Sequence, residues 1–224
     1  MNLLSLLGFI IHHPLNSGGR IAALRRFAQW QIASRLIRQP IAMPFVGETR
    51  LLSSTGMTGA TGNWYNGLHE PEEMAFVLHA LRAGDLFVDI GANVGSYSVL
   101  AAGAAGAEVI AAEPLPATYA KLAANIRLND LTALVDARCC GLSDQPGELR
   151  FTAGLDTMNR VALPDEAVPS EVVPVTTLDQ LCGSRMPSVI KIDVEGHELA
   201  VLAGGAAVLA APGLQAVLME TNGS

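Results

Sequence analysis

The chain has 224 residues, of which 50% are hydrophobic and 16% are charged, and its formal net charge is −7. This composition excludes a disordered chain and suffices for one α/β domain with an extension. The negative charge argues against nucleic acid as a partner. Three cysteines, two of them adjacent, make no disulfide framework, so reduced thiols and a cytoplasmic location are expected.

Residues 1–50 are predicted to form a basic helical extension of a domain that spans residues 51–224. The first 47 residues hold five arginines and no acid, which leaves nine basic against 21 acidic residues, or −12, in the remainder. Helical spacing in the extension puts one set of apolar residues on one face: Ile21, Leu24, Ala28, Ile32 and Leu36, with Phe27, Trp30 and Ile37 widening it. We expect this helix either to pack on the acidic body or to contact a membrane surface or a carrier.

The segment between the extension and the main alternation of elements is predicted to hold a small strand pair over residues 41–53. Residues 55–67 repeat Thr-Gly and Asn-Gly, which predicts a loop, either a plain connection or one that lines a site with Trp64 and Tyr65. Acids and a proline at Glu70–Glu73 then indicate a helix start.

Strand and helix patterns alternate from residue 86 onward. Apolar runs predict core strands near residues 86–90, 109–112, 134–140, 188–193 and 214–220. Residues 148–152 and 172–176 break the rhythm and predict a β-hairpin insertion over the site, with Met158-Asn159-Arg160 at its tip. The fold class is therefore α/β, with a Rossmann-like, mostly parallel and doubly wound sheet.

A glycine-spaced turn follows the first core strand and is the centre of the predicted site. Glycines let the backbone approach a ligand closely, and the amides of the following helix start are donors. The cofactor-binding residues predicted in this turn are Asp89, Gly91, Ala92, Asn93, Gly95 and Ser96.

Glu113 ends the next core strand, where a carboxylate accepts both hydroxyls of a ribose. The turn departs from Gly-x-Gly-x-x-Gly, and Asp89 lies two residues before its first glycine. A carboxylate there suits the ammonium of a methionine and repels a pyrophosphate. These features favour S-adenosylmethionine over a dinucleotide as the cofactor.

Acidic residues and a histidine follow the fourth core strand and supply the catalytic candidates: Asp193, Glu195 and His197. Asp193 or His197 would serve as the base that deprotonates a substrate hydroxyl. The same cluster, with Glu198, has ligand types that suit Mg²⁺ or Mn²⁺, but it would need a distant ligand such as Glu220, so no metal is predicted.

With the glycine turn, Glu113 and the Lys191–Glu198 run, the chain resembles the FkbM family of S-adenosylmethionine-dependent methyltransferases over about residues 68–222. The resemblance implies O-methylation of a sugar or polyketide-like hydroxyl, on a small-molecule or glycan acceptor. It also implies that Gly141 lies at the adenine edge and Asp193 near the sulfonium.

Folds of this kind usually finish with two further strands, which have no counterpart before Ser224. We therefore expect either a truncated chain or a domain without that hairpin, whose exposed sheet edge favours a homo-oligomer. Two alternatives stay open: a nicotinamide-dependent oxidoreductase, and a non-catalytic module that binds a cofactor or partner.

Overall fold

The computed structural model describes residues 3–153, 159–163 and 167–219, and a five-stranded sheet lies at its centre. The strand order is β10-β9-β3-β4-β5, and every pair is parallel. The strands are β3 (Leu86–Ile90), β4 (Glu108–Ala112), β5 (Val135–Arg138), β9 (Val189–Ile192) and β10 (Ala216–Met219). All five predicted core strands are thus confirmed; β3 has the predicted bounds, β4 begins one residue earlier, and the other three are shorter than predicted.

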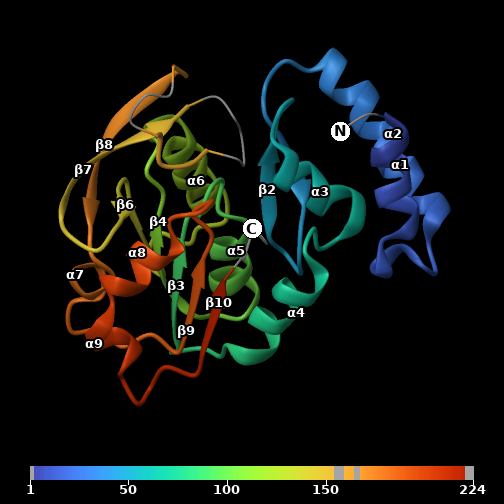
Figure 1. Ribbon diagram of the computed structural model, residues 1–224. Coiled ribbons are helices and arrows are strands. Elements are labelled where there is room, and N and C mark those ends of the chain that lie inside the picture. The colour runs from blue at the N-terminus through green and yellow to red at the C-terminus, as the bar shows by residue number, and fades with distance from the viewer. Residues whose placement is uncertain (1–2, 154–158, 164–166, 220–224) are drawn as a thin grey trace.

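Helices cover both faces of this sheet, as Figure 1 shows for α7–α9 on one side and α4 and α5 on the other. Phe87 of β3 packs toward the first set of helices: α4 (Pro71–Ala80), α5 (Ser96–Val99) with its π-helical continuation Leu100–Ala104, and α6 (Pro116–Leu128). Val88 and Ile90 pack toward the second set: α7 (Leu178–Cys182), α8 (Glu198–Ala203) and α9 (Ala206–Leu209). The side chains of one strand alternate between the two cores, which confirms the doubly wound α/β class.

The helix predicted after the fourth core strand is divided into α8 and α9 by Gly204 and Gly205. A Cβ on Gly204 would lie 2.3 Å from the backbone oxygen of Ser143, and one on Gly205 would lie 2.6 Å from Leu178 Cδ2. Close approach of neighbouring segments therefore requires glycine at both positions, and glycine weakens a continuous helix.

A second sheet of three strands confirms the predicted hairpin insertion. Its order is β6-β8-β7, and β7 pairs antiparallel with β8. The strands are β6 (Gly141–Leu142), β7 (Gly147–Thr152) and β8 (Ser170–Thr176). Phe151, Val173 and Val175 bury their side chains against Leu115. Of the predicted tip, Met158 lies outside the described residues, and Arg160 follows β7, where its backbone N–H donates to Thr152 Oγ1 at 3.0 Å.

The N-terminal extension is a helical pair, α1 (Leu3–His12) and α2 (Arg20–Leu36), joined by a 3₁₀ turn at Pro14–Asn16. The predicted burying face of α2 is confirmed only on the side of Phe27 and Trp30. Ala23 and Trp30 are buried, whereas Ile21, Ile32 and Leu36 are 85%, 62% and 78% exposed. The helix carries apolar residues on two sides, and periodicity alone does not show which side finds a partner. Among the described residues, no helix is long and apolar enough to span a bilayer.

The segment after the extension contains the predicted strand pair, β1 (Ile41–Pro44) and β2 (Arg50–Ser53), which are antiparallel. The predicted loop at residues 55–67 is largely a helix instead, α3 (Thr58–Asn66). Tertiary packing overrides the weak local propensity here, because Ala60 and Tyr65 are buried. A Cβ on Gly62 would lie 2.2 Å from His69 Nδ1, so glycine lets the chain fold back closely on this helix.

Candidate functional site

A cavity of about 260 Å³ lies beyond the carboxyl ends of β3, β4 and β9. This is the edge at which open parallel sheets bind ligands. Segments far apart in the sequence surround it: the glycine turn with α5, the residues after β4 and β9, the start of α4, one side of α3, and Phe151 and Asn159 of the insertion.

The glycine turn brings the backbone of β3 against that of β9. Gly91 has φ +76°, and a Cβ at this position would lie 1.8 Å from the backbone oxygen of Asp193. The backbone N–H groups of Gly91 and Ala92 both donate to Ala112 O at 3.0 Å. Gly91, Ala92, Asn93 and Ser96 line the cavity, whereas Gly95 packs behind it against Leu122.

Glu113 fixes this turn and also faces the cavity. One carboxylate oxygen accepts a hydrogen bond from Asn93 N at 3.0 Å, and the other accepts one from Leu115 N at 3.1 Å. The side chain is 6% exposed, and burial raises the pKa of Glu113 to about 7 despite these two hydrogen bonds. The predicted ribose ligand therefore has a carboxyl group that changes charge near neutral pH.

Asp89 lies beneath the cavity rather than in its lining. Its side chain is fully buried under α5, where Ser98 Oγ donates to Asp89 Oδ2 at 2.6 Å. Burial raises the pKa of Asp89, although Lys191 and the Ser98 hydrogen bond act in the opposite direction. The predicted contact of Asp89 with the cofactor stays a prediction.

Lys191 is the centre of a charged network on the cavity wall. Its Nζ donates to Asp193 Oδ2 at 2.7 Å and lies 4.7 Å from the centre of the Tyr97 ring. Tyr97 in turn donates its hydroxyl proton to Glu70 Oε2 at 2.6 Å. Burial opposes the ammonium form, but Asp193, Asp89 and Glu70 outweigh it and raise the pKa of Lys191.

His197 lies apart from the other predicted catalytic residues. It lines a small neighbouring cavity with Gly141, and its Nε2 is 3.0 Å from Ser143 Oγ. Burial lowers the pKa of His197. Asp193 and Glu195 line the main cavity instead, with Glu195 in a left-handed backbone conformation at φ +50°. The structure thus divides the three candidates between two adjoining cavities, and the base role of His197 stays a prediction.

The wall formed by α3 confirms that the segment at residues 55–67 lines the site. Asn63 Nδ2 donates to Ser96 Oγ at 3.1 Å, and Asn63 Oδ1 accepts from His69 N at 2.8 Å. Burial lowers the pKa of His69, which also lines the cavity. Trp64 and Tyr65, predicted to pack in the site, pack on the N-terminal helices instead.

Several lining residues were not singled out from the sequence: Asn63, His69, Tyr97 and Lys191. Lys191 had a readable signal, because a lysine inside a strand of apolar residues is buried only with a partner. Asn63 and His69 had none, since the helix that positions them was not predicted.

The electrostatics of the cavity suit a cationic ligand. The described lining contains one lysine, Lys191, and four carboxyl side chains, which come from Glu70, Glu113, Asp193 and Glu195. A sulfonium and an ammonium gain from such surroundings, whereas a pyrophosphate is repelled. Among the described residues, no cluster of three or more His, Cys, Asp or Glu is arranged to hold a metal, and Glu220 lies outside them.

Two known proteins that are similar to this chain are methyltransferases. Hexuronic acid methyltransferase AglP of Haloferax volcanii is 30% identical over 149 residues, which are 60% of this chain and 56% of that protein. The 31-O-demethyl-FK506 methyltransferase FkbM of Streptomyces tacrolimicus is 31% identical over 159 residues, 55% of this chain and 60% of that protein. The chain thus spans little more than half the length of these relatives.

A solved structure, the C-terminal domain of precorrin-6Y C5,15-methyltransferase from Rhodobacter capsulatus, aligns with a TM-score of 0.40 and 22% identity. The alignment covers 63% of this chain and 58% of that one, a likeness too low to carry an argument about function. The Methyltransferase FkbM domain, in contrast, matches residues 89–222, a segment that contains the glycine turn, Glu113 and Asp193. This match supports S-adenosylmethionine as the cofactor, as predicted. The chain therefore belongs to the FkbM methyltransferase domain family.

Proposed function

We propose that the chain transfers a methyl group from S-adenosylmethionine to a hydroxyl oxygen of a sugar or polyketide-like acceptor. The observation that carries this proposal is the cavity itself, in which Glu70, Asp193 and Glu195 present carboxylates beside the glycine turn, within the segment that matches the FkbM domain apart from Glu70. The relatives named above act on a hexuronic acid and on 31-O-demethyl-FK506, which supports an oxygen acceptor.

The bound cofactor would supply an electrophilic methyl group on a cationic sulfur. On the protein side, Glu113 would accept the ribose hydroxyls and Gly141 would lie against the adenine. The backbone of the turn at Gly91–Asn93 lines the cavity and would lie along the methionine end. Glu70 and Asp193 would balance the positive charge of this end.

Asp193 is the residue to which we assign removal of the acceptor proton. It lines the main cavity, and Lys191 holds one of its carboxylate oxygens in place at 2.7 Å. His197 lines the smaller cavity beside Gly141, so we assign it to the adenine end. A base within hydrogen-bond reach of the acceptor hydroxyl helps because a neutral hydroxyl is a poor nucleophile at neutral pH.

Calorimetric titration tests the cofactor first, with S-adenosylmethionine and NADH added in separate experiments. We expect S-adenosylmethionine to bind and NADH not to bind. Tight NADH binding without S-adenosylmethionine binding would contradict the proposal and favour an oxidoreductase.

Formation of S-adenosylhomocysteine with a panel of hydroxylated acceptors then tests the reaction. Hexuronic acid glycosides and macrolides are compared with analogues in which the reactive hydroxyl is absent, and turnover should require the hydroxyl. Asp193→Asn should lower kcat by about 10²–10⁴-fold, the usual contribution of a general base. His197→Ala is the matched comparison and should mainly weaken cofactor binding; the reverse pattern would identify His197 as the base.

A further inference from the structure

Helix α2 presents a second apolar face that is not buried against the rest of the described chain. Its inner face, with Ala23 and Trp30 buried, holds the helix on the rest of the chain. The outward residues Ile21, Ile32 and Leu36 are separated by eleven and four positions, which places them on one stripe of the helix. All three are more than half exposed. Folding therefore leaves a stripe of large aliphatic side chains in contact with solvent.

Arginines flank this outer stripe. Arg25 and Arg35 fall close to it on the helical surface, and Arg38 lies just beyond the helix end. Arg35 donates to the backbone and side chain of Gln31 one turn earlier, and no acidic side chain among the described residues pairs with these three arginines. Arg26, in contrast, points inward and donates to Tyr65 O at 2.6 Å.

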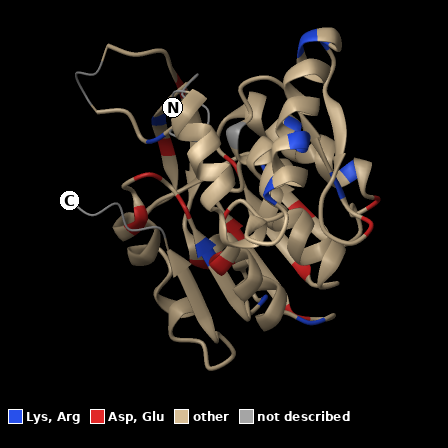
Figure 2. Cartoon of the chain, turned by 90° about the vertical axis from the view of Figure 1, so that its right-hand side faces the viewer, with Lys and Arg blue, Asp and Glu red and all other residues tan. Residues whose placement is uncertain are grey.

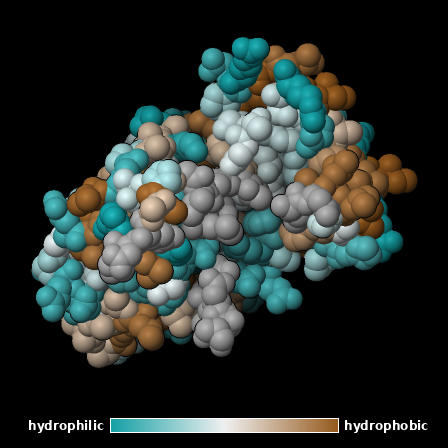
Figure 3. Space-filling view, turned by 45° about the horizontal axis from the view of Figure 1, so that its top comes forward, coloured by the Kyte–Doolittle hydropathy of each residue, from teal (hydrophilic) through white to brown (hydrophobic). Residues whose placement is uncertain are grey.

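The apolar surface continues past the helix end. A shallow groove beside the outer stripe is lined mostly by apolar side chains: Ile32, Ala33, Leu36, Ile37, Ile41, Met43 and Trp64, with Gln29. Helix α1 also carries two exposed leucines, Leu3 and Leu4, which are 61% and 79% exposed. Figure 3 shows hydrophobic side chains gathered on the right-hand part of the molecule, where the N-terminal helices lie.

The charge around this face points to one kind of occupant. The extension carries five arginines without an acid, whereas the rest of the chain carries −12; Figure 2 looks at the molecule from the side of the extension. A symmetric dimer through this face would bring the arginines of two extensions together. An anionic lipid surface instead takes up aliphatic side chains at the acyl boundary and attracts guanidinium groups at the headgroups.

We propose that the outer face of α2, defined by Ile21, Ile32 and Leu36 with Arg25, Arg35 and Arg38, docks the protein peripherally on anionic lipid bilayers. Helix α3 links this face to the cavity, since Trp64 Nε1 donates to Arg26 O at 3.1 Å and Asn63 on the same helix lines the cavity. Docking would hold the wall of the cavity at a fixed position relative to the membrane. This inference is independent of the proposed methyl transfer.

Co-sedimentation of the full chain with phosphatidylcholine vesicles, with and without phosphatidylglycerol, tests the proposal. We expect binding only when phosphatidylglycerol is present, and weaker binding as salt is raised. Replacing Arg25, Arg35 and Arg38 by Gln should lower the partition coefficient about fivefold for each arginine. Ile32→Asp with Leu36→Asp should lower it by at least about tenfold.

The matched control is Leu199→Asp, which changes a leucine of α8 that is 81% exposed and lies outside the extension. It should leave vesicle binding unchanged, and circular dichroism should show all variants folded. Absence of binding to phosphatidylglycerol vesicles, or equal binding by the stripe variants and wild type, would overturn the proposal. An oligomer that forms without lipid and dissociates in the stripe variants would also overturn the proposal, because a second copy of the chain would then cover the face.

Discussion

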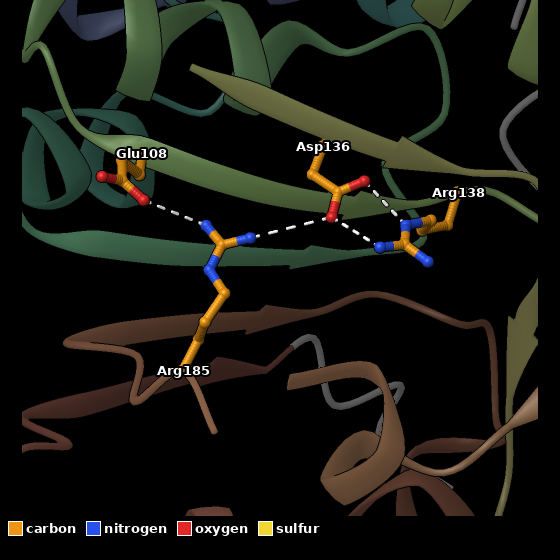
Figure 4. Close-up of polar contacts among 4 residues, drawn as sticks. All are labelled: Glu108, Asp136, Arg138 and Arg185. Carbon is orange, nitrogen blue, oxygen red and sulfur yellow. Dashed lines mark hydrogen bonds and ion pairs between the residues drawn. The ribbon is translucent and has the colours of Figure 1, made fainter. Parts of the chain in front are cut away.

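Two charged clusters of this molecule have the same kinds of contact and different surroundings. On the cavity wall, Lys191 lies 2.7 Å from Asp193, and the Lys191 side chain is 10% exposed. On the outer surface, Arg138 lies 2.7 Å from Asp136, and its side chain is 56% exposed (Figure 4). Arg185 extends the surface cluster to Glu108 at 3.1 Å. Distance alone therefore does not distinguish the two clusters.

Exposure to solvent distinguishes the clusters, as the pKa shifts of Asp136 on the surface and of Asp89, a second acidic neighbour of Lys191, show. The hydrogen bond from Arg138 lowers the pKa of Asp136, so its surroundings favour the charged form. Burial raises the pKa of Asp89, so the surroundings below the cavity oppose the charged form. Charges that cost stability are retained at the cavity, as expected for a site that must bind a cation, whereas surface charges contribute little either way.

Lys191→Met, which breaks the buried cluster, is expected to cause the largest loss in the free energy of unfolding. Removing the ammonium leaves Asp89 and Asp193 without their cationic neighbour, and loss of one partner from a buried pair typically costs about 3–5 kcal/mol. Urea unfolding at neutral pH would measure this loss of the free energy of unfolding. Arg185→Met is the matched control on the surface and should cost less than about 1 kcal/mol. Equal losses in the two variants would contradict the comparison.

Glu113→Gln should change how stability depends on pH. The pKa of Glu113 is raised from 4.5 to about 7, so between these values the folded state holds a proton that the unfolded state has released. Its contribution is fully present below about pH 4.5 and is lost as pH rises through about 7. Wild type should therefore lose up to about 3 kcal/mol across this window, and the Gln variant should lack that loss.

The same carboxyl group should couple pH to cofactor binding. A ribose hydroxyl donates best to an ionised Glu113, so S-adenosylmethionine should bind more tightly as pH rises through about 7. Calorimetry across this range would show the change in Kd, and Glu113→Gln should remove it. A Kd that does not vary with pH in wild type would argue against Glu113 as the ribose ligand.

A smaller effect is expected when Ser98→Ala removes the hydrogen bond to Asp89. Ser98 Oγ donates at 2.6 Å inside the core, and a hydrogen bond to a charged group contributes about 1.5–3 kcal/mol. Ser188→Ala is the control, because Ser188 Oγ donates to Asp85 at 3.1 Å in a partly exposed position. Thermal unfolding of both variants would compare them, and an equal shift in Tm would show that burial adds nothing.

The sequence predicted the sheet well because its signals are local. Apolar runs such as Val109–Ala112 and the glycine turn at Gly91–Gly95 carry their structure in a few adjacent residues. The hairpin insertion was also predicted, since strand-like stretches at residues 148–152 and 172–176 stand on either side of a proline-rich segment. Each of these elements has a pattern that requires no knowledge of distant parts of the chain.

The missed parts of the site depend on contacts between distant segments. Helix α3 forms from a sequence rich in glycine and threonine because Tyr65 and Ala60 find buried positions among other elements. Asn63 reaches Ser96, 33 positions away, only through this packing. Asp89 was assigned to the cofactor by its place at a strand end, and that assignment stays a prediction; its burial beside Ser98 of α5 could not be read from the strand end.

The smallest expected effect is that of Asp136→Asn on the surface cluster. Arg138 lowers the pKa of Asp136 from its ordinary value of 3.8, so the stabilisation is present above that value and is lost as pH falls through the lower folded pKa. Because the side chain is 36% exposed, solvent screens the pair, and we expect a loss of at most about 1 kcal/mol at neutral pH.

Added salt makes this last comparison quantitative. The effect of Asp136→Asn should shrink as salt rises toward about 1 M, where charges are screened beyond about 3 Å, whereas that of Lys191→Met should persist because its neighbours are buried. A double-mutant cycle of Asp136→Asn with Arg185→Gln isolates the 3.7 Å contact between these side chains, whose coupling should be a few tenths of a kcal/mol. A coupling as large as the loss in Lys191→Met would mean that exposure to solvent does not separate the two clusters.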